Sequence, residues 1–433
     1  MQEVIDKLSN EIQKGLSKQM HSRSTVKCWP TYVQDLPTQN ERGKYLALDL
    51  GGTNFRVLLV SINGPDDVDI QTQAFQIAQP LMACPASALF DFIAECLDNF
   101  VKEKQLSDKE LSLGFTFSFP MRQLSLAEAN LVTWTKGFSC DEVVGKNVTK
   151  LLQESISRRG TLKVNIVAII NDTTGALISC AYNHKNCRIG LIVGTGCNAC
   201  YVEKTCNVEM FEDYQTSQKP NMIINCEWGA FGDNGVLDNI LTSFDRMVDK
   251  QTPNQGKQIF EKCVSGMYLG ELVRIIIVKL MEEGKLFNGI ESSIMHENWK
   301  FETKFISAVE SDPPGIFEKC NEVLNECCLN DASDEDKACL RYICETISTR
   351  SAKLVACGLV TLINKMEICD LSVGIDGSLY RRHPKYHDLL MDNVKKYVGT
   401  DVCVQFFTSD DGSGRGAALV AALYKDNKSK KCK

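Results

Sequence analysis

The sequence predicts an α/β protein of two or three domains, and three observations lead to this class. Strand-like apolar runs alternate with helix-like runs through most of the chain. Glycine-containing turns recur where such strands end. The length of 433 residues and the hydrophobic content of 44% are sufficient to build that many cores.

The most informative strand pair lies around residue 50. Residues 45–49 and 55–60 are apolar runs separated by Gly51 and Gly52, which predicts a hairpin. Neither a GxxxxGK[ST] nor a GxGxxG motif occurs there. Glycines and asparagines are common in ordinary tight hairpins, but this turn also offers backbone N–H groups that suit a metal-bound polyphosphate. The side chains beside it are Asp49, Thr53 and Asn54.

Turns of the same type recur further along the chain. Residues 189–202 form a strand, a Gly-Thr-Gly turn around Thr195 and a second strand. A third strand ends in Asp-Gly-Ser at 376–378. Residues 410–424 form a glycine-rich turn that opens a helix, whose N–H groups can hold an anion. Turns of one kind at several strand ends predict one shared phosphate ligand.

The other elements follow from periodicity and from proline. Helical spacing predicts helices over 1–20, 87–104, 144–158, 175–182, 258–283 and 334–365. Apolar runs predict strands over 111–120, where Pro120 ends the strand, over 166–170, and over 223–227, where Glu227 ends the strand. We expect an irregular crossing around Pro30 and Pro37, polar strands and turns over 61–85, and a polar linker without an obvious core over 203–222.

Charge and apolar content exclude several classes of protein. The net charge of −7 and the absence of a long Lys/Arg cluster argue against nucleic acid as a partner. The first residues read as a charged amphipathic helix rather than a signal peptide. The nearest approach to a membrane span, residues 273–280, is short and contains Arg274 and Lys279. We therefore expect a cytosolic protein without a membrane anchor.

The 20 cysteines are scattered through a long chain with no secretion signal, which predicts reduced thiols. Cys197 and Cys200 have C-x-x-C spacing, but no second pair or nearby histidine completes a metal set. His383 and His387 make an equally weak case. We therefore expect no resident metal held by these side chains.

Asn171 and Asp172 follow the predicted strand 166–170 and precede a helix. Ligands of α/β sheets bind at the carboxyl ends of strands, so Asp172 is a candidate general base. Aspartate also caps helices, and this alternative stays open. Glu227 ends another strand and is followed by aromatic and glycine residues that let a small polar ligand approach. A phosphate cradle, a base and a set of sugar-binding polar groups together fit phosphoryl transfer to a hydroxyl.

The residues of that cradle belong to a series of motifs that covers nearly the whole chain. In order they are TYVQDLP, LALDLGGTNFRVLLV, LGFTFSFP, WTKGF, NDTTG, GLIVGTGCNACY, EWGAFGDNG, SGMYLGELVR, ETKF, VGIDGSLY and DGSGRGAALVAAL. A collinear series of this kind is specific. In it the chain resembles the hexokinase family, of the animal single-unit type, and most of all the insect hexokinases.

This resemblance implies the actin-like ATPase (RNase H-like) two-domain hexokinase fold with a hinged cleft. The large domain would comprise 1–42 and 169–413, and the small domain 43–168 plus 414–433. The implied activity is ATP-dependent phosphorylation of D-glucose, and of related hexoses such as mannose or fructose, at the 6-hydroxyl, which is the first step of glycolysis. Mg²⁺ would act as Mg-ATP near Asp49, and the protein would be a monomer.

The resemblance also implies the site residues. Asp172 would be the general base and Lys136 would stabilise charge on the transferred group. The hexose would contact Ser118, Phe119, Thr135, Lys136, Asn171, Asp172, Asn198, Glu227, Gln258 and Glu261. The nucleotide would contact Asp49, Leu50, Gly51, Gly52, Thr53, Asn54, Thr195, Gly266, Met267, Thr303, Lys304, Phe305, Ile306, Ser307, Ser378, Leu379 and Tyr380.

Two positions depart from the family's usual pattern. Cys226 precedes Glu227 where threonine, valine or methionine is more familiar, and Trp299 with Lys300 replaces a small turn before the FETK segment. Two other functions remain open at this point. One is a catalytically impaired hexose-binding sensor or regulatory protein, and the other is a chaperone-type or cytoskeletal ATPase of the same superfamily.

Overall fold

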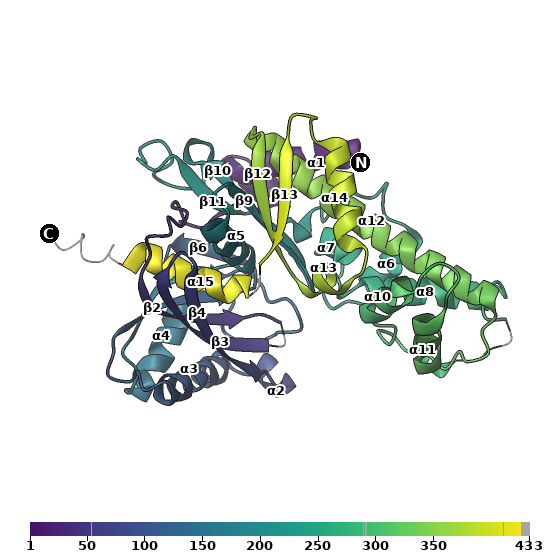
Figure 1. Ribbon diagram of the computed structural model, residues 1–433, viewed down its shortest axis with the longest axis horizontal. Coiled ribbons are helices and arrows are strands. Elements are labelled where there is room, and N and C mark those ends of the chain that lie inside the picture. The colour runs from purple at the N-terminus through teal and green to yellow at the C-terminus, as the bar shows by residue number, and fades with distance from the viewer. Residues whose placement is uncertain (53, 289, 291, 410, 426–433) are drawn as a thin grey trace.

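The computed structural model describes residues 1–52, 54–288, 290, 292–409 and 411–425. It shows two α/β lobes, each built on one mixed sheet (Figure 1). The small-lobe sheet has the order β4-β3-β2-β5-β8. Its strands are β2 (Gly43–Leu50), β3 (Asn54–Gly64), β4 (Asp67–Gln76), β5 (Leu111–Phe117) and β8 (Val164–Ile170).

The large-lobe sheet has the order β1-β11-β10-β9-β12-β13. Its strands are β1 (Trp29–Pro30), β9 (Cys187–Val193), β10 (Cys197–Lys204), β11 (Asn221–Asn225), β12 (Asp370–Asp376) and β13 (Cys403–Thr408). Apart from β1, both sheets use the same topology, in which the first three strands pair antiparallel and the next two add parallel. This repeated topology agrees with the actin-like ATPase fold that the sequence predicts.

Helices cover both sheets, and a small ribbon of β6 (Met121–Ser125) and β7 (Glu128–Leu131) extends the small lobe. The small-lobe helices are α2 (Gln79–Met82), α3 (Ala86–Glu103) and α4 (Val148–Arg159). The large-lobe helices are α1 (Gln2–Leu16), α6 (Ser243–Lys250), α7 (Ile259–Val264), α8 (Leu269–Glu282), α9 (Ser293–His296), α10 (Thr303–Ser311), α11 (Glu318–Glu326), α12 (Asp334–Met366), α13 (Ser378–Arg382) and α14 (Tyr386–Tyr397). Helices α5 (Asp172–Asn183) and α15 (Gly412–Tyr424) pack against each other between the sheets (Figure 1).

The alternation of side chains along β2 explains how one strand serves two cores. Leu46, Leu48 and Leu50 join the core under α3 and α4, whereas Tyr45 and Ala47 join a central core with α5 and α15. Because side chains alternate between the faces of a strand, Asp49 shares the central face. The strand therefore carries its carboxylate toward the start of α15.

Contact between α5 and α15 depends on glycine. A Cβ atom on Gly416 would lie 2.1 Å from the carbonyl oxygen of Gly175, and one on Gly114 of β5 would lie 2.1 Å from the carbonyl oxygen of Ala417. Both obstacles are backbone atoms, which cannot move without separating the elements. The absence of side chains at these positions lets α15 lie directly against α5 and the small-lobe sheet.

We expect Gly416→Ala to lower the free energy of unfolding by about 1–3 kcal/mol, because the added methyl group overpacks the helix contact. Denaturant titration of the variant and the wild type measures this difference. Gly399→Ala is the control, since its Cβ would meet its nearest neighbour, Val402, at an ordinary 3.8 Å. Equal losses in both variants would show that close packing at Gly416 is not the cause.

In the part of the chain that the structure describes, one helix is long and apolar enough to cross a bilayer, and it is α12 rather than the run 273–280. Of its most apolar window, 78% is buried inside the protein, as in a core helix. A capping box of Ser333 and Asp336 begins α12, and Glu367 with a φ of 55° ends it. The helix is thus a buried element of the large lobe.

Most predicted elements are present, and several differ. The strand expected to end at Glu227 is β11, which ends at Asn225, and the region 61–85 contains the short helix α2 beside its strands and turns. Helix α1 ends at Leu16 rather than residue 20, and the expected crossing near Pro30 contains the edge strand β1. The predicted helix 258–283 is two helices, α7 and α8, separated at 265–268. The expected linker 203–222 includes the end of β10 and the fully buried Val208, so it does contribute to the core.

Candidate active site

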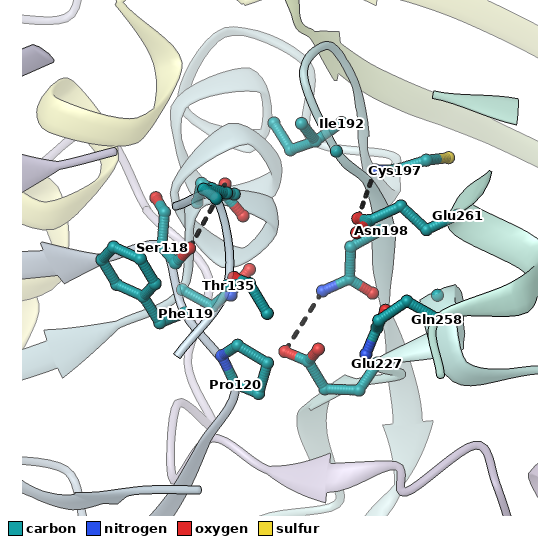
Figure 2. A pocket seen from close by; sticks show the side chains of 15 residues that line it. Ser118, Phe119, Pro120, Thr135, Ile192, Cys197, Asn198, Glu227, Gln258 and Glu261 are labelled. Carbon is teal, nitrogen blue, oxygen red and sulfur yellow. Dashed lines mark hydrogen bonds and ion pairs between the residues drawn. The ribbon is translucent and has the colours of Figure 1, made fainter. Parts of the chain in front are cut away.

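A cavity between the lobes collects all ten residues that the sequence assigns to a hexose (Figure 2). Its empty volume is about 430 Å³, including open solvent at its mouth. Small-lobe residues lie on one side, with Ser118, Phe119, Pro120 and Thr135 in view, and Asn198, Glu227, Gln258 and Glu261 lie opposite them (Figure 2). The site is therefore made by segments far apart in the sequence that the two sheets bring together.

An aromatic cluster holds the small-lobe side. The Phe119 ring lies 4.9 Å from Trp134 and 5.0 Å from Phe138, both edge-on, and Trp134 stacks on Phe138. The Trp134 indole Nε1 donates to the carbonyl oxygen of Cys140 at 2.9 Å. These contacts fix both ends of the loop that carries Thr135 and Lys136.

Lys136 lies where the two lobes meet. Its Nζ donates to the carbonyl oxygen of Ser118 at 2.7 Å and lies 3.8 Å from Oδ2 of Asp172. A Cβ on Gly52 would be 3.9 Å from the Lys136 side chain, and one on Gly196 would be 3.7 Å from it. The ammonium group is thus next to the candidate base, and the aliphatic part of the Lys136 side chain lies beside two of the predicted phosphate turns.

The helix cap after β8 is Asn171, which leaves Asp172 for the cavity. The Asn171 Oδ1 accepts from the backbone N and the Oγ1 of Thr173, at 2.9 Å each. Asp172 is the first residue of α5, and its Oδ1 also accepts from the Thr173 backbone N at 2.9 Å. Its Oδ2 faces Lys136. This geometry disfavours capping as the sole role of Asp172.

A hydrogen-bonded chain forms the opposite wall. The Asn225 Nδ2 donates to Glu227 Oε1 at 2.7 Å, and the Asn198 Nδ2 donates to Asn225 Oδ1 at 2.8 Å. Glu261 Oε2 accepts from the backbone N of Cys197 at 3.0 Å. Glu227 has a φ of 53°, in the left-handed region that non-glycine residues rarely adopt. Strained backbone of this kind is typical of functional sites.

The two glutamates of this wall have unusual acidities. Burial, together with the negative charges of Asp172 and Glu261, raises the pKa of Glu227 to about 7. Burial also raises the pKa of Glu261. A cavity lined by carboxylates, amides and an ammonium group provides both donors and acceptors, as a polyhydroxyl ligand requires.

A second pocket opens on the large lobe and contains many of the residues assigned to the nucleotide. It is lined by Thr195, Gly266, Met267, Gly270, Glu271, Trp299, Phe301, Glu302, Thr303, Lys304, Ser307, Ser378, Leu379 and Arg382. Its floor is built from turns in close contact. Gly377 has a φ of 120°, and a Cβ there would lie 2.3 Å from the carbonyl oxygen of Val193. Gly266 N donates to the carbonyl oxygen of Gly194 at 2.7 Å.

Some residues assigned to the nucleotide do not line this pocket. Phe305, Ile306 and Tyr380 are buried in the large-lobe core, and the Tyr380 hydroxyl shares a 2.5 Å hydrogen bond with His387 Nδ1. Asp49, Leu50, Gly51 and Gly52 belong to the small lobe. Thr53 lies outside the described residues, and only the backbone of Asn54 is described.

Asp49 is tied into a network at the start of α15. Its Oδ2 accepts from Arg56 Nε at 3.1 Å and from Ser413 Oγ at 2.7 Å, and Arg56 also pairs with Asp411. Burial opposes the charge of Arg56, but Asp49 and Asp411 raise the pKa of its guanidinium. The first turn and the α15 turn are therefore held together by ionic contacts.

Among the residues that the structure describes, no group of three or more His, Cys, Asp or Glu side chains is placed to hold a metal ion. Cys197 and Cys200 are buried in β10. His383 is buried and lies 3.2 Å from Glu310, and His387 contacts Tyr380. The side chains considered for a metal in the sequence have other contacts here.

The sequence reasoning missed several residues of the cavity. They are Pro120, Ile192, Gly196, Cys197 and Gly229, with Asn225 behind them. The two glycines carried a signal, because glycine permits close approach. A Cβ on Gly229 would lie 2.2 Å from Gln258 Oε1, and one on Gly196 would lie 2.6 Å from Glu261 Oε2.

Fold and site together define a two-lobed protein of the actin-like ATPase fold with a polar cavity between its lobes. Two family models, both described as hexokinase, match residues 1–182 and 188–423. The chain belongs to the hexokinase family.

Its similarity to known members extends over nearly all of its length. It is 45% identical over 430 residues to Hexokinase-2 of Homo sapiens. The aligned region covers 97% of this chain and 46% of that protein. The chain thus spans about half the length of the curated relatives it matches. A hexokinase structure from Schistosoma mansoni, described as complexed with glucose, is 40% identical with a TM-score of 0.92, covering 97% of this chain and 94% of that one. Another hexokinase crystal structure is 32% identical with a TM-score of 0.80 and the same coverage.

Proposed function

We propose that this protein transfers the γ-phosphoryl group of ATP to the 6-hydroxyl of D-glucose and of related hexoses such as mannose and fructose. The product would be a hexose 6-phosphate, the entry point of glycolysis. The observation that carries this proposal is the position of Lys136. It lies 3.8 Å from Asp172 in a cavity lined by sugar-type ligands and beside two phosphate-type turns.

The residues take distinct roles in this reaction. The amides and carboxylates of the Asn198–Glu227–Glu261 wall bind the sugar hydroxyls and orient the ring. Asp172 Oδ2 accepts the proton of the 6-hydroxyl as the oxygen attacks phosphorus. The Lys136 ammonium stabilises the negative charge on the transferred group, and its own contact with Ser118 places it for that role.

Closure of the lobes would complete this arrangement. Ser118, Thr135 and Lys136 belong to the small lobe, whereas Glu227 and Glu261 belong to the large lobe. A sugar that contacts both sets favours the state in which they are close together. Closure excludes water and so limits hydrolysis of ATP.

The residues present fit magnesium as part of Mg-ATP. Mg²⁺ typically binds one or two carboxylates together with substrate phosphates and water, and the Asp49 carboxylate is placed beside the first turn for such a contact. When bound, the ion neutralises phosphate charge. Arg56 and Ser413 hold Asp49 in position before any nucleotide arrives.

We infer further that the protein acts as a cytosolic monomer of the animal type. The free state of every cysteine that the structure describes supports a reducing compartment. Similarity to insect hexokinases stays a prediction.

A coupled assay for glucose 6-phosphate with glucose, ATP and Mg²⁺ tests the proposed function. 6-Deoxyglucose is the matched control, because it keeps the ring contacts and lacks the accepting hydroxyl. With ATP and Mg²⁺ present, we expect glucose to give a phosphorylated product. We expect 6-deoxyglucose to give none and to inhibit competitively with glucose. Glucose binding without product would instead indicate the sensor, and ATP hydrolysis that does not depend on sugar would indicate an ATPase of another kind.

Trp299 gives a prediction for the nucleotide pocket. It lines that pocket with a φ of 68°, where glycine is favoured, and its N donates to Glu271 Oε2 at 2.6 Å. The indole lies edge-on to Tyr268 at 6.1 Å. We expect Trp299→Gly to raise the KM for ATP about threefold to tenfold, because an apolar wall against the adenine ring is lost. The kcat should not change, because the proton acceptor Asp172 is untouched.

Steady-state kinetics at saturating glucose measure this effect. Trp299→Phe is the control and should retain most of the ATP affinity, because it keeps an aromatic face. An unchanged KM in Trp299→Gly would exclude Trp299 from the nucleotide site.

A further inference from the structure

Two thiols of the small lobe lie side by side next to the loop that carries Lys136. Cys84 lies between α2 and α3, and Cys140 ends the segment that begins at Trp134. Pro85 and Asp141, the residues that follow them, form an isolated parallel bridge. The Ser139 N also donates to the carbonyl oxygen of Met82 at 2.7 Å. The two segments therefore run together in register, and Cys84 and Cys140 are neighbours one step before the bridge.

The register between two paired segments decides whether neighbouring cysteines can form a disulfide bond. Paired segments run about 4.7–4.9 Å apart, within the Cα separations that disulfides use, and residues in register point to the same side. Both sulfur atoms in fact approach the carbonyl oxygen of Leu81, Cys84 Sγ at 3.3 Å and Cys140 Sγ at 3.4 Å. Their shared acceptor places the two thiols close together.

A second pair shows the contrast. Cys369 and Cys403 are both exposed, and the Cys403 N donates to the carbonyl oxygen of Cys369 at 2.7 Å. However, Cys403 is in register with Asp370, so Cys369 is one residue out of phase. Adjacent residues of a strand point to opposite faces. The backbones of Cys369 and Cys403 are therefore close together, but their side chains are badly placed for a disulfide bond.

We propose that Cys84 and Cys140 are a redox-sensitive dithiol that closes to a disulfide under hydroperoxide. Cys84 is partly exposed and Cys140 is buried, so Cys84 is the thiol that the oxidant reaches. Its thiolate sulfur attacks one peroxide oxygen, giving a sulfenic acid and one water or alcohol. The Cys140 sulfur then attacks the Cys84 sulfur and expels hydroxide, which leaves as water with the Cys140 proton. Two thiols are oxidised by two electrons, and one hydroperoxide is reduced.

Burial, with a further contribution from Cys84, raises the pKa of the Cys140 thiol to about 11. This direction agrees with Cys140 as the resolving rather than the first-reacting thiol. The buried pairs elsewhere, Cys28 with Cys226 and Cys180 with Cys187, have no exposed member for the oxidant to reach. Accessibility thus distinguishes Cys84 and Cys140 from those pairs.

The bond would act on Lys136 through Trp134. The Cys140 carbonyl anchors the Trp134 indole, and the Phe138 N donates to the Thr135 carbonyl oxygen at 3.1 Å within the same loop. A disulfide requires the sulfur atoms to approach to about 2.05 Å, which draws Cys140 toward α2. This part of the inference rests on the proposed function. Since a 1 Å misplacement of a catalytic group can cost about 10²-fold, we expect kcat to fall about tenfold on oxidation.

The experiment treats the full chain with hydrogen peroxide, blocks remaining thiols and maps the peptides by mass spectrometry. We expect a peptide pair joined through Cys84 and Cys140, two hydrogens lighter, that dithiothreitol separates. Cys84→Ser should lack this pair and keep its kcat after peroxide, and Cys140→Ala serves as a second variant. The 369–403 pair is the internal control and should stay unlinked.

Oxidation of the exposed cysteines without a Cys84–Cys140 link would overturn the dithiol. A link that leaves kcat unchanged would overturn its effect on Lys136. The peptide map does not depend on activity, so a chain that makes no sugar phosphate yet forms the link would refute the proposed function and leave the dithiol standing.

Discussion

Replacing Asp172 by alanine is expected to lower kcat by about 10²–10⁴-fold while the glucose affinity changes by less than about tenfold. The reason is the division of labour in the cavity. Asp172 Oδ2 faces Lys136. In the proposed function, the amides and glutamates of the opposite wall, which are linked by their own hydrogen bonds, would supply most contacts for the sugar. Removing the carboxylate takes away the proton acceptor but leaves the binding wall complete. Stopped assays of product and calorimetry with glucose measure the two quantities separately.

Two controls make this result specific. Asp172→Asn keeps the shape and the hydrogen bond to Thr173 but cannot take a proton, so it should lose kcat almost as severely. Asp108→Ala removes an exposed carboxylate before β5, at the end of the strand away from the cavity, and should be neutral. If Asp172→Asn retained most of the wild-type kcat, proton transfer to this carboxylate would not be part of the reaction.

The second large effect concerns Glu227 and pH. With a pKa of about 7, Glu227 is half protonated at neutral pH, and only its charged form accepts strong hydrogen bonds from sugar hydroxyls. We therefore expect glucose to bind more weakly as the pH falls from 8 to 6. Glu227→Gln should weaken binding at pH 8 by about 10–100-fold, as expected for a hydrogen bond to a charged group, and should remove the pH dependence. Calorimetric titration with glucose at several pH values measures both effects.

The same pKa affects stability with a defined sign. A carboxyl group that binds its proton more tightly in the folded protein contributes stability below its ordinary pKa of 4.5, and this contribution is lost as the pH rises through 7. The difference between 4.5 and 7 corresponds to at most about 3 kcal/mol. Glu227→Gln should therefore be more stable than the wild type at pH 8 and similar to it near pH 4.5. A wild-type glucose affinity that does not change between pH 6 and 8 would contradict the assigned acidity.

Much of the fold could be predicted because its signals are local. The apolar runs around Gly51 and Gly52 specify a hairpin, and the strand 166–170 is apolar on both faces because α15 covers one side of its sheet. Long-range pairing was harder to predict. The edge strand β1 has only two residues, and its identity as a strand comes from its partner β11 rather than from its own sequence. The burial of Val208 likewise depends on tertiary contacts, which the polar residues around it in the sequence do not indicate.

The grouping of residues in one cavity was predictable where a motif carries them, whereas their contacts with a hexose stay a prediction. All ten residues assigned to the hexose line one cavity, and Asn171 rather than Asp172 proves to be the main cap of α5. A contiguous segment such as 303–307 is less reliable, because a helix turns some of its residues inward. Phe305 and Ile306 accordingly join the core while Thr303, Lys304 and Ser307 face the pocket. Asn225 lies behind Glu227, and its role depends on hydrogen-bond geometry that residue identity does not specify.

The most direct test of the central claim is a crystal structure of this chain with glucose and a non-hydrolysable ATP analogue. The account predicts the sugar ring against Asn198, Glu227 and Glu261, with its 6-hydroxyl within hydrogen-bond distance of Asp172 and pointing toward the analogue's terminal phosphate beside Lys136. A sugar bound outside this cavity, or one whose 6-hydroxyl points away from Asp172, would contradict it.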